Sequence, residues 1–421
     1  MEIQFPVKQT PFEEAAKQAG TPYYLYHGDE IRNNFRTLKS ALWSGLEFFF
    51  SLKANPNVSL VSLLHNEGAG TEVCSLTELK TVQMAGVPPE KIIFVGPAKS
   101  QQELTEAIKY GVYAIICESL SEFSRIEAIA TELGVTQGVA MRVNPEFSAK
   151  KARLTMGGKP RQFGIDQQTL LAELPKLDKG QATKILGIHV YMGTRILSEP
   201  EVGENTKNIL ELADSVKELL GRPLEMVDIG GGLGVPYFAN EESIDPHKVG
   251  EEVNPLLAAY RDRNPKTRVF MELGRYLVGA SGVFVTRVVS RKESYGETFL
   301  ISDGGTNCHM AAVGIGSFVK RNFPIASITH FSKEATEKYN LAGPLCTPND
   351  VIGKAVELPS TEEGDLIGVF NSGAYGPSAS PVNFLSFGHP AEVLYDQGKL
   401  HIIRESDKPE DLLKKQKLVT F

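Results

Sequence analysis

The chain has 421 residues, of which 42% are hydrophobic and 23% are charged, and its formal net charge at pH 7 is −7. A chain of this length buries a large core and commonly forms two domains. The acidic balance argues against nucleic acid or an anionic membrane as the partner. No basic segment precedes an apolar run at the start, and no apolar stretch is long enough to span a bilayer. We therefore expect a globular cytoplasmic protein, and the four scattered cysteines favour free thiols over disulfides or a metal site.

The segment from residue 47 to residue 273 alternates short β-rich runs with longer helical patterns. Alternating strands and helices indicate parallel β-α units, and eight such units favour a closed (β/α)₈ barrel over an open doubly wound sheet, which is the alternative. The spacing of Ser75 and Glu78 predicts a capping box, and a long helical segment is predicted between Pro200 and Gly221. The eight predicted strands are 47–53, 71–75, 92–96, 114–118, 139–144, 185–192, 225–229 and 268–273.

A change of pattern near residue 277 indicates a second domain. Residues 282–289 alternate as a strand does, Gly and Pro turns follow, and helical periodicity is weak. The aromatic run 23–26 is predicted to be a strand that joins this part of the protein. The charged segment 408–417 is expected to form a terminal helix. The expected division is a barrel at 28–270, with 1–27 and 271–421 forming a β-sandwich or β-barrel domain.

The residues directly after the predicted strands are the candidates for chemistry, because the active site of such a barrel lies at the carboxyl ends of its strands. Lys53 follows the aromatic run 48–50 and precedes Asn-Pro. Desolvation lowers the pKa of an ammonium and frees the neutral amine that a Schiff-base lysine uses to bind a carbonyl. The alternative is a strand-end lysine that extends into solvent.

Further polar residues and glycines coincide with other strand ends. The amides of Gly230, Gly231 and Gly232 are suited to a phosphate, although triple glycines also occur in plain tight turns. Arg275 offers a bidentate cation to the same phosphate. Glu272 is placed to keep a ring nitrogen protonated, as pyridoxal chemistry requires. The remaining candidates are Glu72 and Ser75 on the second strand and His189 and Tyr191 on the sixth.

Seven motifs, in this order, resemble those of the fold-type III pyridoxal-phosphate decarboxylases, the group of the diaminopimelate, ornithine and arginine-type enzymes. The resemblance extends over nearly the whole chain. It implies an alanine-racemase-like (β/α)₈ TIM barrel, a C-terminal β domain, pyridoxal 5′-phosphate as the cofactor, and α-decarboxylation of an amino acid. The motifs are Ser-Leu-Lys-Ala-Asn (51–55), Thr-Glu-Val-Cys-Ser-Leu-Thr-Glu-Leu (71–79), Gly-Val-Pro-Pro-Glu-Lys-Ile-Ile (86–93), Asp-Ile-Gly-Gly-Gly-Leu-Gly (228–234), Glu-Leu-Gly-Arg (272–275), Gly-Pro-Leu-Cys (343–346) and Gly-Ala-Tyr-Gly (373–376).

The resemblance also implies roles for single residues. Lys53 binds the cofactor covalently, and Glu272 pairs with its ring nitrogen. Cys346 enters the site from the second subunit of a head-to-tail homodimer and protonates the product carbon, so the active sites are shared, and no metal is expected. The implied phosphate contacts are Gly231, Gly232, Arg275 and Tyr375. The other implied cofactor-binding residues are Glu72, Ser75, His189, Tyr191, Thr194, Gly230 and Gly274.

Several positions depart from the family pattern. Tyr191 stands where the family has a ring-stacking histidine and is expected to stack instead, while His189 either assists or is a core histidine. Leu273 replaces a proline, which we expect to be tolerated. Thr347 replaces the acid that binds a distal amine, and Ala311 replaces the arginine that binds diaminopimelate. A distal ammonium therefore lacks an obvious partner, which argues against lysine biosynthesis.

Segments 156–166, 343–348 and 371–376 are most similar to the branch of the family that acts in the butirosin pathway. That branch decarboxylates L-glutamate held as a thioester on an acyl carrier protein, and a thioester suits a distal pocket without a fixed charge. A basic loop is a candidate contact for an acidic carrier or simply a solvated surface, and similar loops occur in decarboxylases of exosortase clusters. Its basic residues are Lys150, Lys151, Arg153, Lys159 and Arg161.

The expected function is thus decarboxylation of a specialised or carrier-bound amino acid, as in secondary metabolite biosynthesis. Three alternatives stay open. A decarboxylase of free diaminopimelate, ornithine, arginine or lysine would need a distal-amine acceptor that the sequence does not reveal. An amino-acid racemase would lack the Gly-Pro-Leu-Cys motif at 343–346, which is present. A non-catalytic paralogue or cofactor carrier is disfavoured because Lys53, Glu272 and Cys346 occur together.

Overall fold

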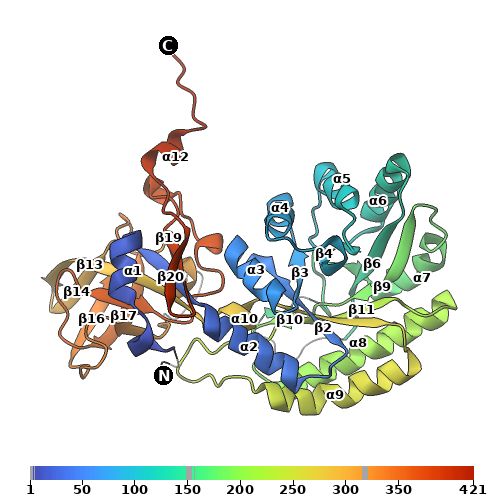
Figure 1. The fold of residues 1–421 in the computed structure, drawn as a ribbon, viewed down its shortest axis with the longest axis horizontal. Coiled ribbons are helices and arrows are strands. Elements are labelled where there is room, and N and C mark those ends of the chain that lie inside the picture. The colour runs from blue at the N-terminus through green and yellow to red at the C-terminus, as the bar shows by residue number, and fades with distance from the viewer. Residues whose placement is uncertain (1–2, 4, 148–153, 156, 315–320) are drawn as a thin grey trace. The chain divides into compact units, whose positions relative to one another are not determined.

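The computed structural model describes residues 1–421 except 1–2, 4, 148–153, 156 and 315–320 (Figure 1). The chain divides into two compact units. The segment 236–241 was expected to be part of the barrel domain, but it belongs to unit 1. Unit 1 comprises Met1–Ile31, Pro236–Glu241 and Val278–Phe421, and unit 2 comprises Arg32–Val235 and Glu242–Leu277.

Unit 2 contains a closed barrel of eight parallel strands (Figure 1). Each strand pairs in parallel with its neighbours, and the pairings of β12 with β2 and of β5 with β6 complete the ring. All eight strands overlap the expected ones, so the prediction of a (β/α)₈ barrel is confirmed. The strands are β2 Leu46–Ser51, β3 Gly70–Val73, β4 Ile92–Phe94, β5 Ala114–Cys117, β6 Gln137–Asn144, β9 Thr183–His189, β11 Met226–Gly231 and β12 Arg268–Leu273.

Local signals in the sequence explain where the helices between these strands begin and end. Ser100 and Glu103 form a complete capping box at α5, and α8 ends at Gly221 in the left-handed conformation. The box predicted for Ser75 and Glu78 is only half formed, because the Glu78 carboxylate accepts from the backbone N–H of Cys74 instead. The helices are α2 Gly28–Ala41, α3 Val58–Asn66, α4 Leu76–Met84, α5 Gln101–Tyr110, α6 Leu120–Leu133, α7 Gln167–Leu177, α8 Glu199–Leu220, α9 Pro246–Arg263 and α10 Arg275–Val278.

Apolar side chains fill the interior of the barrel. Phe49 of β2 and Phe270 of β12 are fully buried, and their ring centroids lie 4.5 Å apart. Ile93, Ile116 and Met226 belong to the same buried cluster. Such a core makes the barrel a packed body rather than a pore, so polar chemistry is confined to its ends. Short strands β7 Leu154–Thr155, β8 Ile165–Asp166 and β10 Gly193–Thr194 complete unit 2.

Unit 1 is built mainly of β-strands, as predicted. β1 Tyr23–His27 pairs antiparallel with β13 Gly282–Ser294 and parallel with β19 Ala391–Asp396, so the N-terminal strand joins the sheet of the C-terminal part. Residues 408–417 contain the short helix α12 Pro409–Leu413. The other strands are β14 Glu297–Ser302, β15 Ile325–Ser327, β16 Glu337–Ala342, β17 Val351–Leu358, β18 Leu366–Val369 and β20 Lys399–Arg404. The helical segments are η1 Val7–Gln9, α1 Phe12–Ala19, α11 Met310–Val313, η4 Pro377–Ala379 and η5 Phe384–Ser386.

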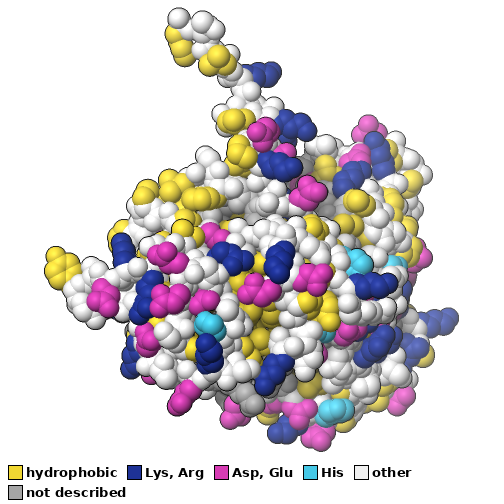
Figure 2. All heavy atoms as spheres, turned by 60° about the vertical axis from the view of Figure 1, so that its left-hand side comes forward, with side chains coloured by type: hydrophobic (Ala, Val, Ile, Leu, Met, Phe, Trp, Pro, Cys, Tyr) yellow, Lys and Arg dark blue, Asp and Glu magenta, His cyan; other side chains and the backbone are white. Residues whose placement is uncertain are grey.

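The surface carries charges of both signs. On the face that Figure 2 shows, lysine and arginine side chains lie interspersed with aspartates and glutamates. Within the described part of the chain, every helix is too short or too polar to cross a membrane. The expectation that neither nucleic acid nor a membrane is a partner stays a prediction, as does the cytoplasmic location.

Candidate active site

Lys53 lies just beyond the end of a barrel strand, in the single helical turn η2 Leu52–Ala54 after β2. Its Nζ donates to Oε1 of Glu72, on β3, over 2.5 Å and lies 5.5 Å from the centroid of the Tyr191 ring. The side chain of Lys53 is 36% exposed, whereas that of Glu72 is fully buried. The ammonium therefore reaches toward the end of the barrel with a buried carboxylate beneath it.

The charge state of Lys53 differs from the expectation. Burial lowers its pKa, as predicted, but the charges of Glu72, Cys74 and Glu272 raise it, and the net pKa lies well above the usual value. The prediction of a neutral amine was wrong for this state because Glu72 comes from the neighbouring strand, at a distance that the local sequence does not reveal. Glu72 is also placed to receive the proton that Lys53 must lose before its amine binds a carbonyl.

A second buried cluster combines residues from three adjacent strands. Nε2 of His189, on β9, lies 3.0 Å from Oε1 of Glu272, on β12, and both side chains are buried. Burial raises the pKa of Glu272, but His189, Lys53 and, more weakly, Arg142 outweigh it, and the pKa falls to about 2. Glu272 is therefore ionised at neutral pH. His189 is a buried partner of this carboxylate rather than an isolated core histidine.

Asp228, on β11, completes this cluster and was missed as a site residue. One ring nitrogen of His189 and one carboxylate oxygen from each of Asp228 and Glu272 all lie within 4.8 Å of one another, and Asp228 is fully buried. Burial, and then the charge of Glu272, raises the pKa of Asp228 well above its usual value. The sequence does contain a signal for this residue, because an aspartate is rare in a buried strand and Asp228 lies in the apolar run before the triple glycine.

The triple glycine forms a turn that tolerates no side chain. Gly230 and Gly232 have positive φ angles of 67° and 86°. A Cβ on Gly231 would lie 1.6 Å from the backbone oxygen of Glu272, and one on Gly232 would lie 2.1 Å from that of Gly193. Packing against neighbouring backbone therefore requires glycine here, and a turn without side chains is also the kind of backbone that can bind a phosphate.

Three buried polar atoms near these residues have no hydrogen-bond partner among the described residues: Oε2 of Glu72, Nδ1 of His189 and Oδ2 of Asp228. Buried polar atoms are normally paired, and an unpaired one calls for an explanation, such as a bound ligand, ion or water. Together with the side-chain-free glycine turn, these atoms fit a ligand that carries a phosphate and a ring nitrogen. The donor set thus suits pyridoxal 5′-phosphate.

Four other residues that were predicted to contact the cofactor have structural contacts of their own. Ser75 accepts from the backbone N–H of Glu78 as the cap of α4, and Thr194 pairs with Leu154 through β10. Gly274 packs directly on the lysine segment, since its Cβ would lie 2.8 Å from that of Ala54. Arg275 is the first residue of α10. Direct contacts of these residues with the cofactor stay predictions.

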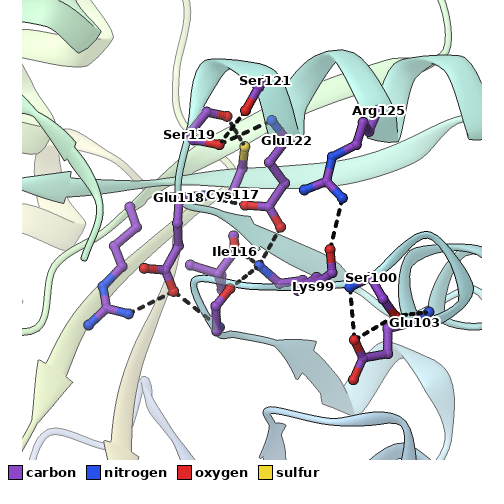
Figure 3. A network of polar contacts seen from close by, with 12 residues as sticks. Lys99, Ser100, Glu103, Ile116, Cys117, Glu118, Ser119, Ser121, Glu122 and Arg125 are labelled. Carbon is purple, nitrogen blue, oxygen red and sulfur yellow. Dashed lines mark hydrogen bonds and ion pairs between the residues drawn. The ribbon is translucent and has the colours of Figure 1, made fainter. Parts of the chain in front are cut away.

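A further buried charge network occupies the carboxyl ends of β4, β5 and β6 (Figure 3). Lys99 donates to Glu122 over 2.6 Å, and Arg142 donates to Glu118 over 2.8 Å. Glu118 also accepts from the amides of Gly96 and Gly164. Two cations and two anions thus neutralise one another and hold two loops at this end of the barrel.

Two predicted site residues, Cys346 and Tyr375, belong to unit 1. Cys346 is an exposed free thiol. The loop before it is held by the buried Asp350, which accepts from the N–H of Leu345 over 2.8 Å and from that of Thr306 over 2.6 Å. Tyr375 has a positive φ of 56°. Their catalytic and phosphate-binding roles stay predictions.

The substrate-side positions are described only in part. Thr347 is half-buried and Ala311 is exposed. Lys159 and Arg161 of the basic loop are exposed, whereas Lys150, Lys151 and Arg153 lie outside the described residues.

Comparison with known proteins matches residues 28–279 to the pyridoxal-binding domain of the pyridoxal-dependent decarboxylases. The chain belongs to this decarboxylase family. It is therefore a pyridoxal-phosphate-dependent lyase, and the cofactor inferred from the donor set is the one the family uses.

Relatives in this decarboxylase family align along nearly their whole length. The chain is 40% identical over 412 residues to the L-glutamyl-[BtrI acyl-carrier protein] decarboxylase of Niallia circulans, covering 97% of this chain and 96% of that one. It is 32% identical to the diaminopimelate decarboxylase of Methanothermobacter thermautotrophicus, covering 96% and 93%. The solved diaminopimelate decarboxylase of Helicobacter pylori with L-lysine superposes with a TM-score of 0.86 at 29% identity, covering 96% and 98%. The predicted family and fold are confirmed.

Proposed function

We propose that the enzyme removes the α-carboxyl group of L-glutamate while the side-chain carboxyl is bound as a thioester to an acyl carrier protein. The observation that carries this proposal is the 40% identity, over nearly all of both chains, to a glutamyl-carrier-protein decarboxylase. The reaction consumes one proton and releases carbon dioxide, leaving a 4-aminobutyryl thioester on the carrier.

The residues at the barrel end have complementary tasks in this reaction. When bound, pyridoxal phosphate supplies the electron sink for the electron pair left by carbon dioxide. Lys53 would hold the cofactor aldehyde, with Glu72 accepting the ammonium proton. Glu272, ionised and bound to His189, would keep the ring nitrogen protonated. Gly231, Gly232 and Arg275 would bind the phosphate, and Tyr191 would cover the ring.

The substrate-side residues support a neutral distal group. Thr347 and Ala311 stand where diaminopimelate decarboxylases are expected to bind a charged distal group, and neither carries a charge. Burying an unpaired ammonium costs several kcal/mol, whereas a thioester brings no charge into the pocket. Free ornithine, arginine, lysine and diaminopimelate are therefore less favoured. The exposed Lys159 and Arg161 would meet the acidic carrier.

The test compares free and tethered substrates on the same cofactor-loaded enzyme. We expect mass spectrometry to detect loss of carbon dioxide from glutamyl-carrier protein and not from free glutamate, ornithine, arginine, lysine or meso-diaminopimelate. A glutamyl thioester of pantetheine alone separates the pocket from the docking surface. Slow turnover of this short thioester would assign the remaining rate to carrier contacts. Turnover of a free diamino acid at a rate equal to or above that of the tethered substrate would contradict the proposal.

A homodimer with shared active sites is part of the proposal, with Cys346 delivering the final proton from the second subunit. We expect Cys346→Ala to keep the cofactor absorbance and to slow or divert protonation of the product carbon. Mixing the inactive Lys53→Ala protein with the impaired Cys346→Ala protein is expected to raise the activity above that of either protein alone, because one hybrid site contains both residues. No recovery after confirmed subunit exchange would refute a shared site.

A further inference from the structure

Asp228 is a buried acidic residue to which the proposed reaction assigns no role. It lies on β11 and is fully buried. Its Oδ1 accepts from the backbone N–H of Gly230 over 2.9 Å, the first amide of the glycine turn. Its Oδ2 is buried without a hydrogen-bond partner among the described residues. Leaving a buried carboxylate oxygen without a donor is costly, so Oδ2 requires a proton or a ligand.

The surroundings of Oδ2 favour a proton on Asp228. Glu272 lies within 4.8 Å of Asp228 and is itself paired with His189. Glu72 is a further negative charge acting on Asp228. Burial and the neighbouring negative charges disfavour a second ionised carboxyl group in this site, so one of the two is expected to keep its proton. The pKa of Glu272 falls to about 2 while that of Asp228 rises, so the proton belongs to Asp228.

We propose that Asp228 is a neutral positioning residue, whose Oδ1 holds the Gly230 amide while its Oδ2–H donates to the Glu272 carboxylate. The proposal rests on the proposed function in one respect, that Glu272 faces the cofactor ring nitrogen. Asp228 then connects the glycine turn, which is proposed to bind the phosphate, with Glu272, which is proposed to face the ring nitrogen. It also leaves a single negative charge, that of Glu272, opposite one protonated ring nitrogen.

The first test uses an isosteric replacement. Asp228→Asn keeps an oxygen for the Gly230 amide and supplies an N–H for Glu272, so it mimics the neutral acid. Asp228→Leu removes both contacts and keeps the number of side-chain heavy atoms. We expect the half-life for cofactor loss on dialysis, followed by absorbance, to stay within about threefold of the wild-type value for Asp228→Asn. For Asp228→Leu, loss of a hydrogen bond to a charged group predicts a decrease of about 10- to 100-fold.

The second test observes the proton directly and does not depend on how well Asp228→Leu folds. Infrared difference spectra of the cofactor-loaded wild type minus Asp228→Asn are expected to show the C=O stretch of a protonated carboxylic acid at neutral pH. The matched control is the same substitution at the exposed Asp262, and the band is assigned to Asp228 only if the wild type minus Asp262→Asn spectrum lacks it.

Each test has an outcome that overturns the proposal. Cofactor loss from Asp228→Asn as fast as from Asp228→Leu would mean that a negative charge is needed at this position. Retention by Asp228→Leu equal to that of the wild type would remove the positioning role. Absence of a protonated-acid band at Asp228 would disprove the neutral state. None of these measurements uses a substrate, so failure of the carrier-bound glutamate assay leaves them unaffected.

Discussion

Two groups of buried charges lie at strand ends of unit 2, and they differ in how completely they are paired. Around β4 to β6, Lys99 donates to Glu122 and to two backbone carbonyls, and Arg142 is bound to Glu118. Around β9, β11 and β12, His189 and Asp228 each keep a buried polar atom without a partner among the described residues. A satisfied network stabilises the fold, whereas an unsatisfied one is prepared for a ligand.

The largest expected effect distinguishes the two lysines. Lys53→Ala is expected to abolish both decarboxylation and the visible absorbance of the lysine-bound cofactor, because it removes the amine that is proposed to hold the aldehyde. Lys99→Arg, which keeps a cation in the paired network, is expected to keep both. Absorption spectra and a carbon dioxide release assay check this. A Lys53→Ala protein that is coloured and fully active would refute the assignment of the site.

The second comparison is between Glu272, in the incompletely paired cluster, and Glu122, in the paired network. We expect Glu272→Gln to lower kcat by about 10²- to 10³-fold, the usual cost of removing one preorganised electrostatic group. Glu122→Gln changes the same atoms in the paired network and is expected to leave the kcat of the folded enzyme within about threefold. Steady-state kinetics on the tethered substrate measure both. Equal losses in the two variants would mean that the networks do not differ in function.

The paired network of Lys99 and Glu122 is expected to contribute to the stability of the fold. Lys99→Met leaves the Glu122 carboxylate buried without its cation, which costs about 3–5 kcal/mol of unfolding free energy. The double variant Lys99→Met with Glu122→Gln removes the uncompensated charge and is expected to recover part of this loss. Urea denaturation of the cofactor-free proteins measures the difference. A single variant as stable as the wild type would show that the network is not required for folding.

The smallest expected effect concerns Glu78, close to Lys53. Burial, opposed by the amide of Cys74, raises the pKa of Glu78 to about 7. Its contribution to stability is therefore complete below the unfolded pKa near 4.5 and is lost as the pH rises through about 7. Glu78→Gln does not ionise, so at pH ~8 we expect it to be more stable than the wild type by about 2 kcal/mol, an advantage that disappears near pH ~5.

Thermal unfolding of both proteins across this pH range is the measurement. The exposed Glu251→Gln makes the same chemical change at the surface and serves as the control. A Glu78→Gln advantage that does not change with pH would assign the effect to packing instead of ionisation.

Much of the barrel was predictable because its strands are buried on both faces and are therefore nearly continuous apolar runs. Ile92–Phe94 and Ala114–Cys117 are examples, and both strands were expected. Boundaries were less exact: β9 ends at His189, so Tyr191 lies beyond the strand to which it was assigned. The membership of 236–241 in unit 1 has no signal in composition and depends on tertiary contacts.

The positions of single site residues were predictable from motifs, whereas their electrostatics were not. Lys53 and Glu272 were expected at strand ends and are found there. The pKa of Lys53 depends on Glu72, which the fold brings from the next strand. Glu78 was expected to complete a cap but binds the Cys74 amide, because the turn before α4 places that N–H within 2.6 Å of its carboxylate.

The pairing of β1 bears on how the protein is synthesised. Tyr23 pairs with Val285 on one side and with Ala391 on the other, so this early strand pairs with strands that are synthesised much later. At about 5–20 residues per second, the ribosome needs tens of seconds to supply them. During that interval the aromatic side chains of Tyr23, Tyr24 and Tyr26, all buried in the finished protein, lack their native neighbours. The sheet of unit 1 can therefore close only after β19 has been made.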